Sequence, residues 1–141
     1  MRVDINIPVE IKASRRVLIV EDNILNQKLV AFMIKGWGLT YRTCNNGKEA
    51  IQALQEDKFD LVLMDIEMPE MNGYEATSYI RNVLKLDIPV IATTAHESAE
   101  EREKCQLSGM NDYLQKPIKE SELLQTIAAY LFPLHNKKFA D

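Results

Sequence analysis

The sequence predicts a three-layer α/β fold in which five βα units form a doubly wound parallel sheet. Short apolar runs recur five times along the chain, and segments with helical spacing of apolar residues separate them. The first, third and fourth runs are continuously apolar, which is typical of strands buried on both faces. Strands that alternate with helices pair in parallel through right-handed crossovers, so the 141 residues are expected to form one principal domain.

Each element follows from a local pattern. The expected strands are 17–20, 39–44, 61–64, 90–93 and 113–114. Four apolar stripes predict helices that pack on the sheet. They comprise Leu25, Leu29, Phe32 and Met33; Ile51 and Leu54; Ile80 and Leu84; and Leu123, Leu124, Ile127 and Leu131.

Helix ends are also marked by residue type. Asn46, Asn72 and Ser98 each precede a glutamate by three residues, which is the spacing of a capping box and predicts a helix start. Glycines follow the expected helices at positions 36, 38 and 109, where a helix is expected to stop.

Composition excludes several classes of protein. Hydrophobic residues make up 46% and charged residues 27%, which argues against disorder. The net charge of −4 argues against nucleic acid or an anionic membrane as the main partner. No apolar run approaches the roughly 18 residues of a membrane span, and no signal peptide opens the chain. Two scattered cysteines, Cys44 and Cys105, favour a reducing cytoplasm over disulfides or structural zinc.

The two ends of the chain differ from the expected domain, residues 15–132. Residues 1–14 alternate apolar and polar side chains from Val3 to Ile11. This segment is either an extra edge strand that pairs with another chain or an irregular arm, because Pro8 cannot donate to a strand ladder. Residues 133–141 are expected to form a polar tail.

Polar side chains follow the expected strands at the edge where parallel sheets bind ligands. They are Glu21 and Asp22 after the first strand, Asp65 after the third, Thr94 after the fourth and Lys116 after the fifth. Three crowded carboxylates repel each other and either protonate or recruit a cation, and oxygen ligands alone select Mg²⁺ or Mn²⁺. A hydroxyl and an ammonium beside such an ion suit a phosphoryl group, with Asp65 as its nucleophile.

Four motifs extend this pattern into a family resemblance. They are VLIVEDN at 17–23, LVLMDIEMPEMNGYEA at 61–76, PVIATTA at 89–95 and NDYLQKPI at 111–118. Over roughly residues 15–132 the chain resembles a response-regulator receiver domain of two-component signalling. That resemblance implies a flavodoxin-like sheet of strand order 2-1-3-4-5.

The resemblance also implies roles for individual residues. Asp65 is the expected phosphoacceptor, with Thr94 and Lys116 contacting the phosphoryl group. The expected Mg²⁺ ligands are Asp65, Asp22 directly, Glu21 mostly through water, and the backbone carbonyl of Glu67. Tyr113 is the expected aromatic switch that responds to Thr94, and the Lys116–Pro117 peptide bond is expected to be cis. Thr94 is preferred to Thr93 as the sensing hydroxyl because it directly precedes a small residue.

The implied function is that of a phosphoacceptor switch, which catalyses at most its own phosphorylation and slow dephosphorylation. The expected donors are a histidine kinase, a histidine phosphotransfer protein or both, because the sequence around Asn23 and Thr94 resembles receivers of hybrid sensor kinases. A homodimer is compatible with this function. The weakly apolar segment 98–108 is either a mobile switch helix or simply a solvated one. His96 and Glu67 either tune water attack on the acyl phosphate or, for His96, form part of an exposed loop.

Three other functions compete with this interpretation. An aspartyl-nucleophile phosphatase is disfavoured because the acidic pair precedes Asp65 and no cap domain fits. A flavin carrier is disfavoured because Glu21 and Asp22 would repel its phosphate. A pseudo-receiver that docks without phosphorylation remains the alternative, although no metal or acceptor carboxylate is missing.

Overall fold

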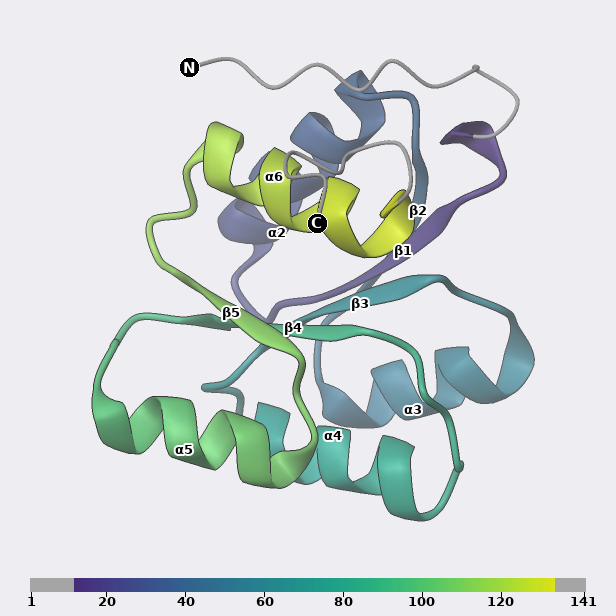
Figure 1. Ribbon diagram of the computed structural model, residues 1–141. Coiled ribbons are helices and arrows are strands. Elements are labelled where there is room, and N and C mark those ends of the chain that lie inside the picture. The colour runs from purple at the N-terminus through teal and green to yellow at the C-terminus, as the bar shows by residue number, and fades with distance from the viewer. Residues whose placement is uncertain (1–11, 134–141) are drawn as a thin grey trace.

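The computed structural model describes residues 12–133 and confirms the predicted fold (Figure 1). Five parallel strands form one sheet in the order β2-β1-β3-β4-β5. The strands are β1 (Arg16–Val20), β2 (Thr40–Cys44), β3 (Leu61–Asp65), β4 (Val90–Thr94) and β5 (Asp112–Gln115). The fifth strand is longer than the two residues expected from the sequence.

Helices cover both faces of the sheet. They are α2 (Ile24–Gly36), α3 (Gly47–Glu56), α4 (Gly73–Asn82), α5 (Ala99–Ser108) and α6 (Glu120–Leu131). Helices α2 and α6 lie on one face, and α3, α4 and α5 lie on the other (Figure 1). None of the helices within residues 12–133 is both long and apolar enough to cross a bilayer.

Two hydrophobic cores lie on opposite faces of the sheet because side chains alternate along each strand. In β1, Val17 and Ile19 belong to the core beneath α2 and α6, whereas Leu18 and Val20 belong to the core beneath α3, α4 and α5. Strands β3 and β4 are buried along their whole length, as their continuous apolar sequence predicts.

The predicted helix starts are confirmed. The side chains of Asn46, Asn72 and Ser98 each accept a hydrogen bond from the backbone amide three residues later. Only Asn72 completes a reciprocal capping box, in which Glu75 accepts from the Asn72 amide at 3.0 Å. At the other end of α5, Gly109 has a φ of 101°, the left-handed conformation that glycine adopts most easily.

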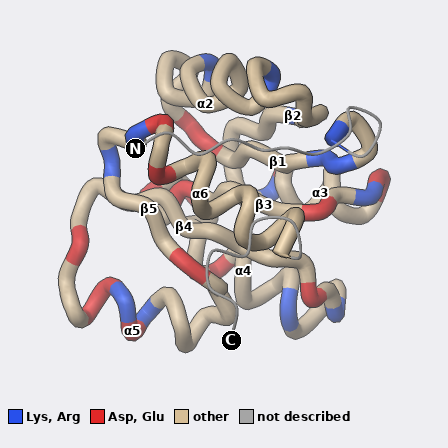
Figure 2. Tube along the Cα trace, turned by 45° about the horizontal axis from the view of Figure 1, so that its top comes forward, with Lys and Arg blue, Asp and Glu red and all other residues tan. Residues whose placement is uncertain are grey.

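The prediction of which face of α2 is buried is wrong for three of its four residues. Leu25, Leu29 and Phe32 are 78%, 52% and 76% exposed, and only the fourth, Met33, is buried. The helix instead buries a second stripe that includes Val30 and Ile34. Ile24, at 52% exposed, joins the first three, and these four residues are called the α2 apolar face. The helix carries lysines but no acidic residue (Figure 2).

The first and last described segments lie together at the amino end of the strands. The guanidinium of Arg15 lies 5.6 Å from the centre of the Phe132 ring, which joins the start of β1 to the end of α6. Residues 12–14 form a short helical turn. The predicted edge strand or arm within residues 1–11, and the tail at 134–141, lie outside the described residues.

Candidate functional site

Residues from four loops and strand ends meet at the carboxyl edge of the sheet. Glu21 directly follows β1, and Asp65 and Thr94 are the last residues of β3 and β4. Lys116 directly follows β5, and its peptide bond to Pro117 is cis, as the resemblance implies. The structure therefore brings the predicted residues together through the sheet topology.

Three carboxylates form a compact acidic cluster. Glu21, Asp22 and Asp65 each place one oxygen within 4.8 Å of the others. Asp65 is 2% exposed and Glu21 is buried, whereas Asp22 is exposed to solvent. An all-oxygen donor set with one solvent-facing side suits a hard divalent cation that keeps several waters. The residues present therefore fit Mg²⁺.

Lys116 pairs with both buried carboxylates. Its Nζ lies 3.0 Å from Oε1 of Glu21 and 3.0 Å from Oδ1 of Asp65. Burial lowers the pKa of Lys116, but the two carboxylates more than offset this, so its pKa is raised and the ammonium stays charged. The lysine thus supplies a fixed positive charge at Asp65.

The environment of Asp65 favours its neutral form when no cation is bound. Burial raises the pKa of Asp65, and the neighbouring Glu21 raises it further, to about 7, although Lys116 opposes the change. A cation placed in the cluster would reverse this preference, because it favours the ionised carboxylate.

The connection after β3 holds Asp65 against the start of α4. The Glu67 amide donates to Oδ1 of Asp65 at 3.3 Å. A Cβ on Gly73 would lie 2.5 Å from the Asp65 carbonyl oxygen and 2.9 Å from the Ile66 Cα. Only glycine allows the helix to begin this close to the strand end. The predicted ligand role of the Glu67 carbonyl remains a prediction.

The hydroxyl of Thr94 is engaged by its own loop. Its Oγ1 donates to the His96 carbonyl at 2.8 Å and accepts from the His96 amide at 3.0 Å. Thr94 is 1% exposed, and the neighbouring Thr93 is also buried and lies opposite Asp65 in the sheet. Both threonines are therefore held in place, and the sensing role of Thr94 remains a prediction.

Tyr113 is held by the segment that leads into α5. Its hydroxyl donates to Oε1 of Glu97 at 3.1 Å, and the guanidinium of Arg102 lies 5.2 Å from its ring centre. Glu97 and Arg102 also form an ion pair. Within α5, Cys105 is the only buried residue, so the helix has little apolar contact with the domain, as its composition predicts.

Two exposed side chains lie beside the cluster. Nε2 of His96 lies 3.6 Å from Oε1 of Glu67, and their side chains are 74% and 63% exposed. The prediction that His96 is an exposed loop residue is confirmed. Whether the pair tunes water attack stays a prediction.

Gln27 has a structural role that the sequence alone does not indicate. This residue is 8% exposed, and its amide nitrogen contacts the loops after β1 and β2. Its position in the helix could have indicated that it is buried, because Gln27 lies three and seven residues before the buried Val30 and Ile34 and therefore on the same side of α2.

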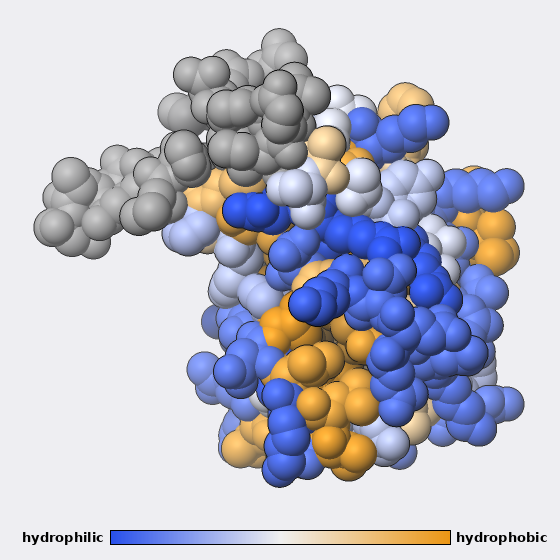
Figure 3. Space-filling model, turned by 90° about the vertical axis from the view of Figure 1, so that its right-hand side faces the viewer, coloured by the Kyte–Doolittle hydropathy of each residue, from blue (hydrophilic) through white to orange (hydrophobic). Residues whose placement is uncertain are grey.

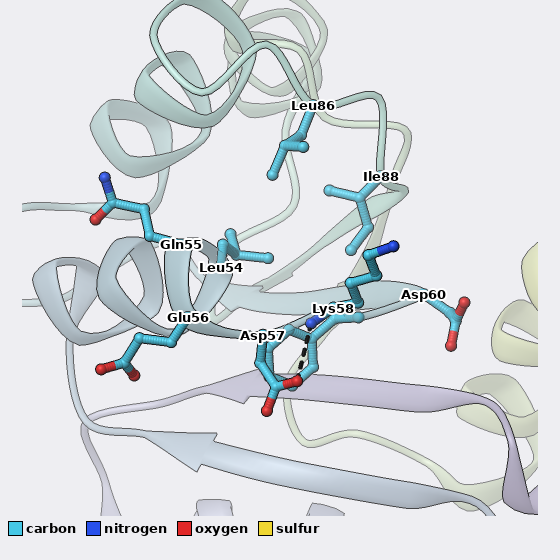
Figure 4. A pocket seen from close by; sticks show the side chains of 9 residues that line it. Leu54, Gln55, Glu56, Asp57, Lys58, Asp60, Leu86 and Ile88 are labelled. Atoms are coloured by element: carbon cyan, nitrogen blue, oxygen red, sulfur yellow. Dashed lines mark hydrogen bonds between the residues drawn. The ribbon is translucent and has the colours of Figure 1, made fainter.

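A further cleft is separate from the acidic cluster. It lies at the amino end of the strands, has a volume of about 620 Å³, and includes Leu54, Phe59, Leu86 and Ile88 among its lining residues. Figure 3 views this end of the molecule and shows apolar side chains gathered among hydrophilic ones. In Figure 4, Leu54, Leu86 and Ile88 point into a common space bordered by charged residues. Since the strands run parallel, this cleft lies at the opposite end of the sheet from Asp65.

Comparison with known proteins assigns a family to this geometry. Residues 17–128 match the family described as the response regulator receiver domain. The chain is 40% identical over 114 residues to the sensor histidine kinase RcsC of Salmonella typhi, covering 81% of this chain and 12% of the kinase. It is 40% identical over 131 residues to the sensor protein GacS of Pseudomonas syringae, covering 90% of this chain and 14% of that protein. The chain thus spans a small part of these relatives.

Solved structures agree with the fold. The receiver domain of the sensor histidine kinase PA1611 from Pseudomonas aeruginosa, solved with magnesium in its active-site cleft, has a TM-score of 0.77 at 35% identity. The match covers 84% of this chain and 98% of that one. The receiver domain of Ssk1 from Saccharomyces cerevisiae, solved with the histidine phosphotransfer protein Ypd1, has a TM-score of 0.81 at 31% identity, with 89% and 94% covered.

Proposed function

The chain belongs to the response-regulator receiver family, and on that premise we propose that Asp65 accepts a phosphoryl group from a phosphohistidine on a partner protein. The observation that carries the proposal is the buried Asp65 carboxylate within the acidic cluster, with the Lys116 ammonium 3.0 Å away. Within residues 12–133, these three carboxylates form the only cluster of three or more acidic, histidine or cysteine side chains close enough to share a metal ion.

The proposed transfer makes one bond and breaks one bond. An Asp65 carboxylate oxygen attacks phosphorus, an O–P bond forms, and the N–P bond of the phosphohistidine breaks, so the imidazole leaves with the electron pair. Lys116 orients the Asp65 oxygen and offsets negative charge on the phosphoryl group. Mg²⁺ held by Glu21, Asp22 and Asp65 would supply further neutralisation of the phosphoryl oxygens.

The switch proposed to follow involves Thr94 and Tyr113. To contact a phosphoryl group on Asp65, the Thr94 hydroxyl must break its two hydrogen bonds with the His96 backbone. That movement would shift the loop that carries Glu97, and Tyr113 would then lose its acceptor. The weakly packed α5 would follow because it buries so little.

A histidine phosphotransfer protein or a histidine kinase is the proposed partner, and the α2 apolar face supports this. The face begins at Ile24, next to the acidic loop, and Leu29 also lines a small hollow of about 60 Å³ beside Lys116 and Pro117. An exposed apolar surface beside the reacting group suits a docking protein. The Ssk1 receiver, which resembles this chain, was crystallised with such a phosphotransfer protein.

In this proposal the domain works as a phosphoacceptor switch within a phosphorelay rather than as an enzyme with a separate substrate. The free, buried thiols of Cys44 and Cys105 fit a reducing setting such as the cytoplasm. Burial raises the pKa of Cys44 to about 11, so this thiol is unreactive.

Intact-mass spectrometry after incubation with acetyl phosphate and Mg²⁺ tests the acceptor. We expect a mass gain of one phosphoryl group, absent from Asp65→Asn and absent when a chelator is added. A beryllofluoride trial detects an acceptor whose phosphate is lost too quickly to observe. If neither reagent modifies or binds the wild-type protein, the phosphoacceptor function is refuted and a pseudo-receiver that only docks replaces it.

The partner surface is tested by Phe32→Glu, with Leu107→Glu as the matched control. The two side chains are 76% and 80% exposed, but Leu107 lies on α5, away from the α2 apolar face. Transfer from a phosphorylated histidine phosphotransfer protein such as yeast Ypd1 should slow about fivefold or more in Phe32→Glu, the effect of losing roughly 1 kcal/mol at an interface. Labelling by acetyl phosphate should not change. Equal slowing in both variants would contradict the docking surface.

A further inference from the structure

Gln27 is a polar side chain on the buried face of α2. It is 8% exposed and lies in one helix stripe with Val30, Ala31 and Ile34, all of which are buried. A leucine or methionine would fill this position without burying an amide, and a buried amide is unfavourable unless it is hydrogen-bonded. The contacts of the Gln27 amide therefore indicate what the residue does.

The Gln27 amide joins the ends of two neighbouring strands. Its Nε2 lies 3.0 Å from the Glu21 carbonyl oxygen, which follows β1, and 3.2 Å from the Cys44 carbonyl oxygen, which ends β2. A third acceptor, Oδ1 of Asn45, lies 3.0 Å away. Because the amide has two protons, these three acceptors share them.

The loop fixed by Gln27 carries two of the three acidic residues. The Glu21 carbonyl is held by Gln27, while its carboxylate accepts from the Asn23 amide at 3.1 Å and pairs with Lys116. Asp22 lies between these anchored neighbours and is itself exposed. The position of the Asp22 carboxylate therefore depends on how firmly the backbone on each side of it is held.

We propose that Gln27 is a positioning residue that sets the acidic loop, residues 21–23, in the geometry that binds Mg²⁺. The inference rests on the proposed function. A loop that is already held in place loses less conformational entropy when the cation binds, so the affinity of the site for Mg²⁺ is higher. Outer-shell contacts of this kind are typically worth about 10-fold to 100-fold in metal affinity.

The variant that tests this is Gln27→Met. Methionine has similar length and helix propensity but cannot donate to the three oxygens. By isothermal titration calorimetry, we expect Mg²⁺ to bind about 10-fold more weakly than to the wild type. In the metal-free protein, the backbone amides of residues 21–23 should exchange with deuterium faster than in the wild type.

Ile34→Val is the matched control because it loosens the same buried face of α2 without touching the acidic loop. Its Mg²⁺ affinity and the exchange of residues 21–23 should equal those of the wild type. Asn45→Ala removes one acceptor from an exposed position and should weaken Mg²⁺ binding less than Gln27→Met does.

The outcomes separate this inference from the function on which it rests. If the wild type binds Mg²⁺ and Gln27→Met binds it equally well, the positioning role is overturned and the phosphoacceptor function stands. Equal weakening in Gln27→Met and Ile34→Val also overturns it, because the effect then comes from general loosening. If the wild type itself does not bind Mg²⁺, the proposed function fails and this inference fails with it.

Discussion

Replacing Asp65 with asparagine is expected to stabilise the metal-free protein, and the gain should increase as the pH rises. Burial and Glu21 raise the pKa of Asp65 from 3.8 to about 7 in the folded state. The stability that the neutral carboxyl contributes is complete below pH 3.8 and is lost as the pH rises to about 7. Asparagine cannot ionise and therefore avoids this loss.

The size of the effect follows from the pKa change. At 1.36 kcal/mol per pH unit, ionising Asp65 in the folded protein costs about 4 kcal/mol at pH 8. About 3 kcal/mol of this cost arises between pH 5 and pH 7, where the folded and unfolded carboxyls differ in protonation. The advantage of Asp65→Asn in the free energy of unfolding should therefore be about 3 kcal/mol larger at pH 8 than at pH 5.

Urea unfolding at the two pH values, with a chelator present, measures this difference. Trp37 is the single tryptophan and packs against one of the two cores, so its fluorescence follows unfolding. Asp57→Asn is the control: Arg16 lowers the pKa of the exposed Asp57, so removing that charge should destabilise the protein above the ordinary carboxyl pKa. An advantage of Asp65→Asn that is the same at pH 5 and pH 8 would refute the reasoning.

Two further predictions concern the frame around the site. Gly73→Ala should destabilise the protein by about 1–3 kcal/mol in urea unfolding, because its Cβ would overlap the Asp65 carbonyl, whereas Gly36→Ala meets no atom within 4 Å and should be neutral or stabilising. Arg81→Met should cost about 3 kcal/mol in the same assay, because Arg81 donates to three acceptors that connect the end of α4 to the loops preceding β4 and β5. A loss below about 0.5 kcal/mol would contradict this role.

The strands and the acidic cluster were predictable for a physical reason. A strand buried on both faces is continuously apolar, and β3 and β4 are apolar until the polar residues at their carboxyl ends. Once parallel topology is inferred, Asp65 and Lys116 must emerge at the same edge of the sheet. The capping residues could also be predicted, because a helix start depends on residues only three apart in the sequence.

The face of α2 could not be predicted because the helix has two apolar stripes. Leu25 and Phe32 belong to one stripe, and Val30 and Ile34 belong to the other. Periodicity indicates a helix in either case, and only packing against the sheet decides which stripe is buried.

Hydrogen bonds between side chains and distant loops also could not be predicted from the sequence. The bond from Tyr113 to Glu97 joins residues 16 apart, and the bond from Gln27 to the Cys44 carbonyl joins residues 17 apart. Such contacts depend on loop conformation and rotamers, which no short-range pattern encodes.

The contact between Arg15 and Phe132 has a consequence for any domain joined to this one. Because β1 starts and α6 ends at the same place, the described part of the chain begins and ends at the pole remote from Asp65. If a phosphohistidine donor belonged to the same polypeptide, a flexible linker would have to carry it from this pole to Asp65. For short flexible linkers the effective concentration of such a donor is of millimolar order. In that arrangement, linker length rather than binding affinity would set how often donor and acceptor meet.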